Sequence, residues 1–327
     1  MQFRRLAAAA VATVFVAMAA LSGAARAEDT KLTIMVFQGL QNLPLLAAQS
    51  KGFFAKRGLS VDIKIAPNSD ELRNGLAEGR YQIVHTAVDN ALAMADVANK
   101  DIAVIIGGDN SFNHLMVQPD IKSYADLRGK TVLVDATDTA YALQLYEILR
   151  LNGLNKGDYT VKSVGATVKR LDALQQDKDN KAAILNAPFS IRAEKSGLKD
   201  MGTAVKALGP YQATSGFVMR EWGKANADTV VKYLQAYIEG LRWGLDPANK
   251  AEAIKLYVEA LKLPQDIAEE TYALAVDPKE GLAKEAMFDM NGFNNVLKLR
   301  AAFAGKAPNP PEKYLDLSYY KKALAGL

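Results

Sequence analysis

From residue 31 onward, short β-type runs alternate with helix-type runs, and this alternation restricts the possible folds more than any other feature of the sequence. The first four β-type runs cover residues 31–37, 60–66, 81–87 and 102–108. The stretches between them have the spacing of helices. This βαβαβαβ succession predicts an α/β fold, in which a parallel sheet carries helices on its faces.

Helix boundaries in the first half are marked by residues with known terminal preferences. Asn42 is a candidate N-cap, with Pro44 in the first helical turn, where a missing N–H costs nothing. Gly58 is a candidate left-handed stop. Asn68 followed three residues later by Glu71 has the pattern of a capping box. These residues predict that the first two strand–helix–strand units begin and end as the alternation indicates.

The alternation continues in the second half of the chain. Further β-type runs cover 114–119, 131–134, 159–164 and 182–187, and a last one returns over 211–221. After Trp222 the pattern is helical to the end, with interruptions at Pro247, Pro264 and 307–314. This layout predicts two α/β lobes, the second inserted between the first lobe and its C-terminal helices.

The first 27 residues have the three parts of a secretory signal peptide. Arg4 and Arg5 form a charged start, 6–21 is apolar, and 25–27 reads Ala-Arg-Ala, a small-x-small cleavage site. A membrane anchor is the alternative, but the apolar run is short and rich in weakly hydrophobic alanine. We therefore predict a cleaved signal peptide over 1–27 and a mature protein in the periplasm.

Composition narrows the possible partners and sites. Half of the residues are hydrophobic, which is enough for one large core or two medium ones. Outside residues 1–27 there are 37 basic and 36 acidic residues, so a nucleic-acid partner or an anionic membrane surface is disfavoured. The chain has no cysteine, which excludes disulfides, thiolate metal sites and a lipid-bearing Cys.

Four segments in series resemble a family of bacterial transport proteins. They cover 42–63 (NLPLLAAQSKGFFAKRGLSVDI), 74–94 (NGLAEGRYQIVHTAVDNALAM), 126–134 (DLRGKTVLV) and 314–324 (YLDLSYYKKAL). Together they resemble periplasmic substrate-binding proteins of ABC transporters, in the branch that holds nitrate, sulfonate and taurine binders and the NMT1/THI5-like proteins. The resemblance covers essentially the whole mature chain.

This resemblance implies a two-lobed periplasmic-binding-protein fold of type II, with mixed or parallel sheets flanked by helices and a ligand cleft between the lobes. Lobe 1 is then expected over 28–118 and 212–327, and lobe 2 over 119–211. The crossings between lobes are expected near 118–120 and 209–215.

The function implied by the resemblance is capture of a small solute and its delivery to an ABC permease in the inner membrane. Lobe closure is expected to select the liganded form. The resemblance implies a monomer without cofactor or metal. Two alternatives stay open, because a fold does not fix a function: an enzyme of thiamine-pyrimidine metabolism and a sensor that presents its ligand to a signalling partner.

Candidate ligand-binding residues follow from the rule that ligands of open α/β sheets sit beyond the carboxyl ends of strands, against helix N-termini. In lobe 1 this rule and the resemblance select Phe37, Gln38, Asn42, His85, Thr86, Asp89, Asn90 and Gly108. In lobe 2 they select Asp135, Thr137, Asp138, Thr139, Asn186, Phe189 and Tyr211. Capping, turn formation and core packing are the alternative roles of these residues.

Two acidic residues bear on the charge of the ligand. Sulfonate and nitrate binders usually have hydroxyl or glycine residues where this chain has Asp135 and Asp138. If either carboxylate faces the cleft, it repels an anion, and the ligand should offer a cation or N–H donors. Caps directed elsewhere are the alternative.

The chain has two histidines, His85 and His114, which could form part of a metal or catalytic site. No HExxH pattern and no third ligand accompany them, so unrelated roles are favoured. A Gly-x-Ser-x-Gly elbow and a phosphate loop are also absent from the sequence. We therefore expect a binding protein and not an enzyme.

Overall fold

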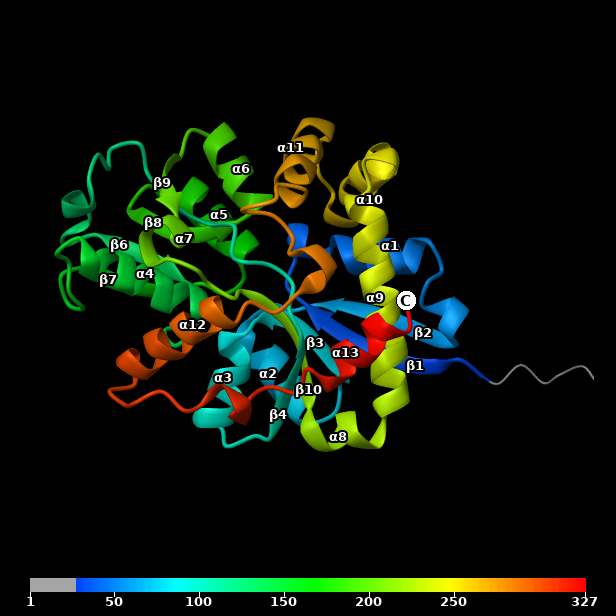
Figure 1. Cartoon of the computed structure of the whole chain (residues 1–327). Coiled ribbons are helices and arrows are strands. Elements are labelled where there is room, and N and C mark those ends of the chain that lie inside the picture. Colours follow the sequence, from blue (N-terminus) through cyan, green and yellow to red (C-terminus); the bar gives the residue numbers. More distant parts are fainter. Residues whose placement is uncertain (1–27) are drawn as a thin grey trace, which may run out of the picture.

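The computed structural model describes residues 28–327, which form two five-stranded sheets flanked by helices (Figure 1). The signal peptide predicted over 1–27 lies outside the described residues. We call the part built on the sheet of β1 the first lobe and the part built on the sheet of β6 the second lobe.

The sheet of the first lobe is mixed, with the order β2-β1-β3-β10-β4. Its strands are β1 Thr30–Val36, β2 Leu59–Ile65, β3 Ile83–Ala87, β4 Ile102–Ile106 and β10 Thr214–Met219. β1 pairs in parallel with β2 and β3, whereas β10 runs antiparallel between β3 and β4. The four strands of the βαβαβαβ succession run in one direction, as predicted. The sheet is mixed because β10 returns from the second lobe in the opposite direction, and a mixed sheet is one of the two forms that the resemblance implied.

The sheet of the second lobe has the order β7-β6-β8-β5-β9. Its strands are β5 Asn113–Val117, β6 Thr131–Val134, β7 Thr160–Ser163, β8 Asn180–Asn186 and β9 Lys199–Thr203. β6 pairs in parallel with β7 and β8, and β5 runs antiparallel to β8 and β9. The chain thus changes sheets between Ile106 and Asn113, while the lobe boundaries at 118 and 212 stay a prediction.

The helices between the strands of the first lobe are α1 Leu43–Ser50, α2 Ser69–Ala77 and α3 Asp89–Asp96. The Asn68 cap is confirmed, because its side chain accepts a hydrogen bond of 2.8 Å from the N–H of Glu71. Asn42 precedes α1 but makes no capping bond; it donates instead to the carbonyl of Phe37 at 2.9 Å. Gly58 is left-handed, with a φ of 66°, but it follows the short 3-10 turn η2 Ala55–Arg57 and not α1 itself.

The remaining helices surround the second sheet and then return to the first lobe. Those of the second lobe are η3 Tyr124–Leu127, α4 Ala140–Leu151, α5 Thr167–Gln176, α6 Phe189–Lys195 and α7 Ala204–Leu208. The C-terminal helices are α8 Arg220–Ala225, α9 Ala227–Leu245, η4 Pro247–Asn249, α10 Lys250–Leu261, α11 Gln265–Ala275, η5 Lys284–Ala286, α12 Met290–Phe303, η6 Pro311–Lys313 and α13 Ser318–Ala325. The predicted interruptions at Pro247, Pro264 and 307–314 are confirmed, since each lies at or between helix ends.

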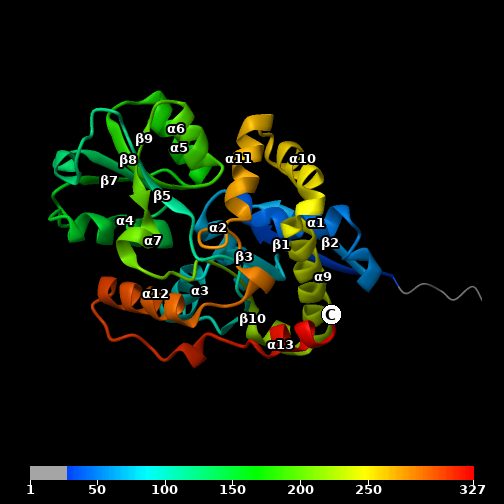
Figure 2. The same cartoon turned by 45° about the horizontal axis from the view of Figure 1, so that its top comes forward.

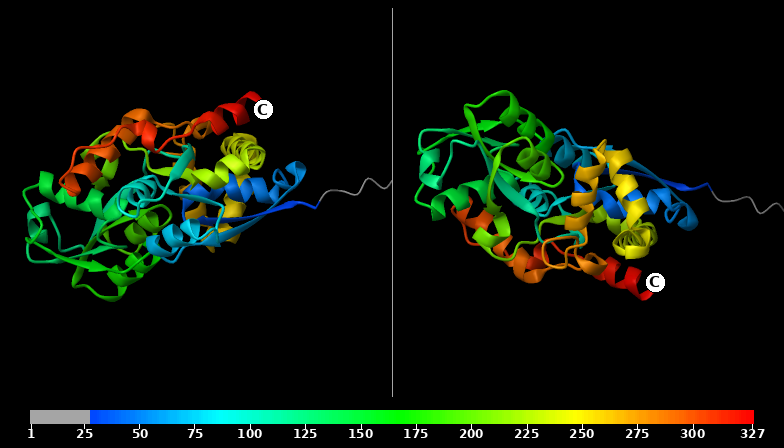
Figure 3. Two further views of the ribbon diagram at one scale, coloured as in Figure 1. Left: turned by 90° about the horizontal axis from the view of Figure 1, so that it is seen from below. Right: turned by 90° about the horizontal axis from the view of Figure 1, so that it is seen from above.

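The C-terminal helices hold the two lobes together from outside the sheets. α9 packs against α1, and α12 packs against both α3 of the first lobe and α4 of the second (Figure 2). Figure 3 shows the second lobe beside the first, with α12 along both of them. Residues at the carboxyl ends of parallel strands of both sheets come together at the junction of the lobes.

Candidate functional site

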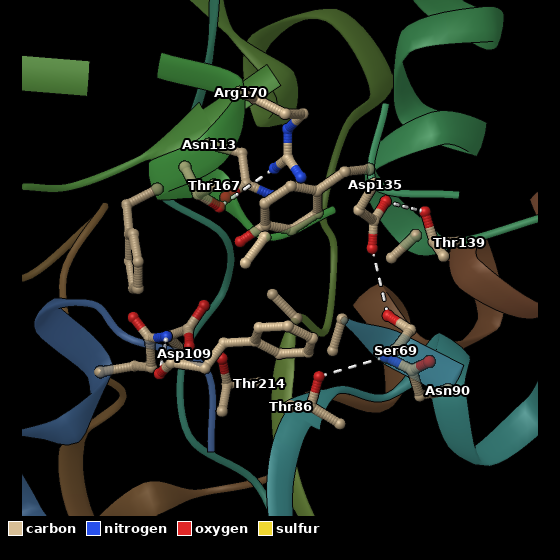
Figure 4. Close-up of a pocket in the computed structure, with 18 residues that line it drawn as sticks. Ser69, Thr86, Asn90, Asp109, Asn113, Asp135, Thr139, Thr167, Arg170 and Thr214 are labelled. Atoms are coloured by element: carbon tan, nitrogen blue, oxygen red, sulfur yellow. Dashed lines mark hydrogen bonds between the residues drawn. The ribbon is translucent and has the colours of Figure 1, made fainter. Parts of the chain in front are cut away.

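A small pocket lies at this junction (Figure 4). It is lined by Phe37, Gln41, Ser69, Thr86, Ala87, Asn90, Asp109, Phe112, Asn113, Asp135, Thr139, Ala140, Tyr141, Ala166, Thr167, Arg170, Ala213 and Thr214. Most of these residues lie at the ends of β1, β3, β4, β6 and β7 or begin the helices after them. The others are Ser69, which begins α2 after β2, and residues at the starts of β5 and β10. About 40 Å³ of the pocket is open to the centres of water molecules, which is more than a single water requires.

The wall from the first lobe is formed at the turn between β3 and α3. Thr86 lies in the last part of β3 and Asn90 in the first turn of α3, so both side chains reach the strand end. The Asn90 amide donates to the Thr86 hydroxyl at 3.1 Å. The amide oxygen of Asn90 is buried and has no hydrogen-bond partner among residues 28–327.

Asp109 lies in the segment that leads from β4 to the second lobe, and its side chain lines the pocket. It is only 1% exposed. One carboxylate oxygen accepts a hydrogen bond of 2.9 Å from the N–H of Ser111, and the other has no partner in the described chain. Burial raises the pKa of Asp109 to about 6, and the nearby Thr214 and Ser111 limit that rise.

The wall from the second lobe begins with Asp135, directly after β6. Its carboxylate accepts hydrogen bonds from the hydroxyl of Thr139, the N-cap of α4, and from the hydroxyl of Ser69 at 3.1 Å (Figure 4). Ser69 begins α2 of the first lobe, so this second bond crosses from one lobe to the other. Both oxygens of Asp135 are therefore occupied within the protein.

Arg170 supplies the positive charge of the pocket from α5. Its guanidinium donates to the carbonyls of Gly165 and Ile184 at 2.6 and 3.2 Å and to the hydroxyl of Thr167 at 3.0 Å. It lies 5.2 Å from the ring centre of Tyr141. Its Nε has no partner, and no carboxylate oxygen of residues 28–327 is within 4.0 Å of the guanidinium.

Burial lowers the pKa of Arg170, whereas the negative charge of Asp135 acts in the opposite direction. An arginine remains protonated across the physiological range even so. The pocket thus contains one buried cation, two carboxylates, several hydroxyl and amide groups, and the aromatic rings of Phe37, Phe112 and Tyr141. Such a set can bind a small solute that has both polar and apolar parts.

Five of the residues selected from the sequence line this pocket: Phe37, Thr86, Asn90, Asp135 and Thr139. Gln38 and Phe189 line a neighbouring hollow, which also includes Phe37. The other eight selected residues do not line the pocket. Their contacts give them other positions in the structure.

Among these eight, Asn42 holds the carbonyl of Phe37, as described above. The imidazole of His85 is 2.9 Å from the hydroxyl of Tyr233 and is stacked on Tyr237 at 4.7 Å between ring centres. Burial lowers the pKa of His85 to about 3, so the ring is neutral. Tyr211 is also buried, in the core of the first lobe.

The carboxylates of Asp89 and Asp138 form ion pairs with arginines. The carboxylate of Asp89 accepts two hydrogen bonds from Arg300, of 2.5 and 2.8 Å, in a buried ion pair. Asp138 faces Arg73 of the first lobe at 3.3 Å. Of the two aspartates that bear on the charge of the ligand, only Asp135 therefore lines the pocket.

The last three selected residues, Thr137, Asn186 and Gly108, also lie outside the pocket. Thr137 is exposed on the loop after β6. Asn186 is buried at the end of β8, where its amide donates to the carbonyl of Ala187 at 3.3 Å. At Gly108 a Cβ atom would lie 2.8 Å from the carbonyl oxygen of Thr214, so a glycine lets this segment approach β10.

Several lining residues were not selected from the sequence: Gln41, Ser69, Asp109, Phe112, Asn113, Tyr141, Thr167, Arg170 and Thr214. Asp109 lies beside the selected Gly108, at a strand end that the rule had marked. Thr167 and Arg170 follow the end of β7, where the same rule applies and would have found them. Ser69 begins α2 after the end of β2, so the same rule would have found it as well.

The two histidines have separate partners in different lobes. His85 contacts Tyr233 as described, and the Nδ1 of His114 is 2.8 Å from a carboxylate oxygen of Asp200. Within residues 28–327, three or more His, Cys, Asp or Glu residues do not come together in a metal-binding arrangement. Among the helices of the same residues, none combines the length and apolar character that crossing a membrane requires.

Several solved structures with this fold are of solute-binding proteins. The periplasmic nitrate-binding protein NrtA from Synechocystis superposes with a TM-score of 0.77 at 14% identity, over 92% of this chain and 89% of that one. The alkanesulfonate-binding protein SsuA from Xanthomonas axonopodis gives 0.69 at 18% identity, over 85% and 92%. A ligand-binding component of an ABC-type import system from Staphylococcus aureus, with zinc bound, gives 0.73 at 14% identity, over 90% and 99%.

These superpositions confirm the predicted two-lobed periplasmic-binding-protein fold. No curated protein matches the chain by sequence. The family model described as NMT1/THI5 like matches residues 40–251, which is more than half of the chain. With the fold and this match in agreement, the chain belongs to the NMT1/THI5-like family, as its sequence segments predicted.

Proposed function

We propose that this protein is an exported solute-binding protein, which captures a small organic molecule between its lobes. The observation that carries the proposal is the pocket itself, because its polar side chains come from both lobes and from the segment that joins them. A solute in contact with both walls stabilises the closed form and so shifts the population towards it.

Delivery to an ABC permease in the inner membrane is the second part of the proposal. The supporting observation is the fold, which this chain shares with the binding components of import systems named above. A periplasmic location agrees with the signal peptide predicted over 1–27. A monomer is the simplest form for a receptor that must close around its solute and then meet its permease.

Binding without catalysis is the third part. None of the lining residues is a histidine, lysine or cysteine, and of the two carboxylates that could act as bases, that of Asp135 is held by two hydroxyl groups. His85 is neutral and lies outside the pocket, against Tyr233. These observations favour a receptor over an enzyme of pyrimidine metabolism with the same fold.

A thermal-shift screen of residues 28–327 tests the proposal. A solute at 100 times its Kd should stabilise the protein by about 2.7 kcal/mol, which raises the Tm by a few degrees. Small-angle scattering should give a smaller radius of gyration with the same solute than without it. Turnover of the bound solute would contradict the receptor and support the enzyme, whereas co-purification with a sensor kinase would replace the permease as partner.

A further inference from the structure

Three residues that line the pocket each have one buried polar atom without a partner, and eight further such atoms lie elsewhere in the described chain. The three at the pocket are one carboxylate oxygen of Asp109, the amide oxygen of Asn90 and the Nε of Arg170. All three residues are at most 2% exposed. Since buried polar groups in proteins are nearly always hydrogen-bonded, their partner is expected to come from the ligand.

The charges of the pocket are not balanced. Asp109, Asp135 and Arg170 line it, and Asp135 has two hydroxyl donors and the nearby positive charge of Arg170. Asp109 has no basic group within 4.0 Å in residues 28–327. One buried carboxylate therefore remains without a counter-charge, and a cation is what this environment lacks.

Asp109 is ionised at neutral pH, so it can act as the acceptor for a cation. Burial raises its pKa to about 6, which still leaves the carboxylate mostly deprotonated above pH 7. The ionisable groups around it are Tyr141 of α4 and Tyr237 of α9, with Asp135 and Arg170 in the same pocket. Burial keeps both tyrosines neutral in the same range, because it raises their pKa.

We propose that the solute is a small nitrogenous compound, which places a protonated N–H group, ammonium or amidinium, on Asp109 and Asn90. A hydrogen-bond acceptor of the same molecule pairs with the Nε of Arg170. This inference rests on the proposed function and names the class of solute. From Asp135 and Asp138 we had expected a ligand that offers a cation or N–H donors. The same expectation now rests on Asp109, because the carboxylate of Asp135 already accepts two hydrogen bonds and Asp138 lies outside the pocket.

The positions of these groups agree with such a ligand. Arg170 comes from the second lobe, whereas Asn90 comes from the first and Asp109 from the joining segment (Figure 4). Arg170 and Asp109 lie on opposite sides of the pocket in this view. A molecule with a donor at one end and an acceptor at the other thus contacts both lobes.

The experiment is a calorimetric titration of residues 28–327 at pH 7.5 with two sets of probes. One set is nitrogenous: ethanolamine, putrescine, acetamidine, 4-aminopyrimidine and β-alanine. The other set is anionic and has no N–H group: propionate, glutarate and ethanesulfonate. We expect binding only within the nitrogenous set, and we expect its affinity to fall between pH 7 and pH 5, as Asp109 takes up a proton.

Asp109→Asn and Asp138→Asn form a matched pair of variants, since only the first residue lines the pocket. Asp109→Asn should weaken the best binder about 30-fold or more, because it removes one side of a buried charge pair. Asp138→Asn should leave the Kd within about twofold. Circular dichroism confirms that both variants are folded before their affinities are compared.

Each result decides between the two proposals. Binding of the anionic probes alone overturns this inference and leaves the solute-binding function intact. Binding of a nitrogenous probe with equal affinity to wild type and Asp109→Asn overturns the role of Asp109. Absence of binding by every probe, with folded protein, counts against the solute class and, if the wider thermal-shift screen is also silent, against the proposed function.

Discussion

At the scale of single residues, Asp109 contributes a penalty to folding that grows with pH. Its pKa is about 6 in the folded protein against 3.8 for the free side chain, so the folded state binds the proton more tightly. The contribution of Asp109 to stability is therefore most favourable at low pH, and it becomes less favourable as the pH rises from about 4 to 6. Above pH 6 the full cost is on the order of 3 kcal/mol.

Replacement of this carboxylate by a neutral amide is the first prediction. We expect Asp109→Asn to increase the free energy of unfolding at pH 8 by up to about 3 kcal/mol, with a gain that disappears near pH 4. Urea unfolding at pH 4, 6 and 8 measures it. Equal stability of variant and wild type at pH 8 would contradict the penalty, and Asp138→Asn serves as the control.

His85 has the opposite dependence on pH and provides the second prediction. Its pKa falls from 6.5 to about 3 on folding, so the folded state resists protonation and stability is lost as pH falls below 6.5. His85→Gln should remove this loss, which amounts to about 1.4 kcal/mol per pH unit at its steepest. Urea unfolding of the variant and of wild type between pH 7 and pH 4 measures this. The difference between their free energies of unfolding should become smaller as the pH falls.

In wild type the two effects offset each other between about pH 4 and 6. As the pH falls through this range, protonation of Asp109 increases the stability of the protein, whereas the neutral His85 decreases it. The acid loss due to His85 should consequently be clearer in Asp109→Asn than in wild type. A variant Asp109→Asn whose stability does not fall below pH 6 would contradict the low pKa of His85.

The site residues that sequence analysis found share a local signal. Thr86, Asn90, Asp135 and Thr139 all lie where a predicted strand passes into a predicted helix, and the strand-end rule needs nothing else. The pattern could not show that Asp89 and Asp138 are turned away, because their arginine partners lie far along the chain. The direction in which these aspartate side chains point depends on such contacts between distant parts of the chain.

At the scale of elements, the crossing of α1 and α9 is built on a glycine. A Cβ atom on Gly240 would lie 2.9 Å from the backbone nitrogen of Ala48 and closer still to the carbonyl oxygen of Pro44. The helices therefore touch backbone to backbone at this point. Glycine costs about 1 kcal/mol inside a helix, so its presence here reflects this close approach.

Gly240→Ala is the third prediction. In an exposed helix the change would stabilise the protein, but here we expect a loss of about 2 kcal/mol or more, because a fixed backbone must move. Gly244→Ala in the same helix is the matched control, since the atoms nearest its new Cβ belong to the side chain of Leu43 and not to a backbone. A Tm of Gly240→Ala at or above that of wild type would contradict the close crossing.

Most of the strands and helices could be predicted from the sequence, whereas the order of the strands in the sheets could not. The runs that became β1 to β8 and the interruptions at Pro247 and Pro264 carry local patterns. β9, with the sequence KDMGT, has no apolar alternation and was missed. The insertion of β10 between β3 and β4 is set by the return of the chain from the second lobe, which no local pattern records.

At the scale of the whole molecule, Arg300 connects both lobes through α12. Its guanidinium pairs with Asp89 of the first lobe in a buried ion pair and also donates to the backbone carbonyl of Asp138 in the second lobe. Ser69 with Asp135 and Arg73 with Asp138 form further links between the lobes. Arg300 differs from these because the same side chain supports both the fold and the contact of the lobes.

Arg300→Met is therefore expected to act in two ways, and this is the fourth prediction. It leaves the buried carboxylate of Asp89 without a partner, which should cost about 3–5 kcal/mol of folding free energy. It also removes one link between the lobes, so the radius of gyration from small-angle scattering should increase. Arg73→Gln, which loses only the partly exposed pairs with Asp70 and Asp138, should change stability by about 1 kcal/mol or less.

The double variant Asp89→Leu with Arg300→Met separates these two effects. Replacing both members of a buried pair by apolar residues is often neutral, so folding stability should recover. The link to the carbonyl of Asp138 stays absent, and the larger radius should therefore persist. Recovery of both quantities would mean that Arg300 acts on the lobes only through the stability of α3, whereas an unchanged radius in the single variant would assign lobe contact to Ser69 and Arg73.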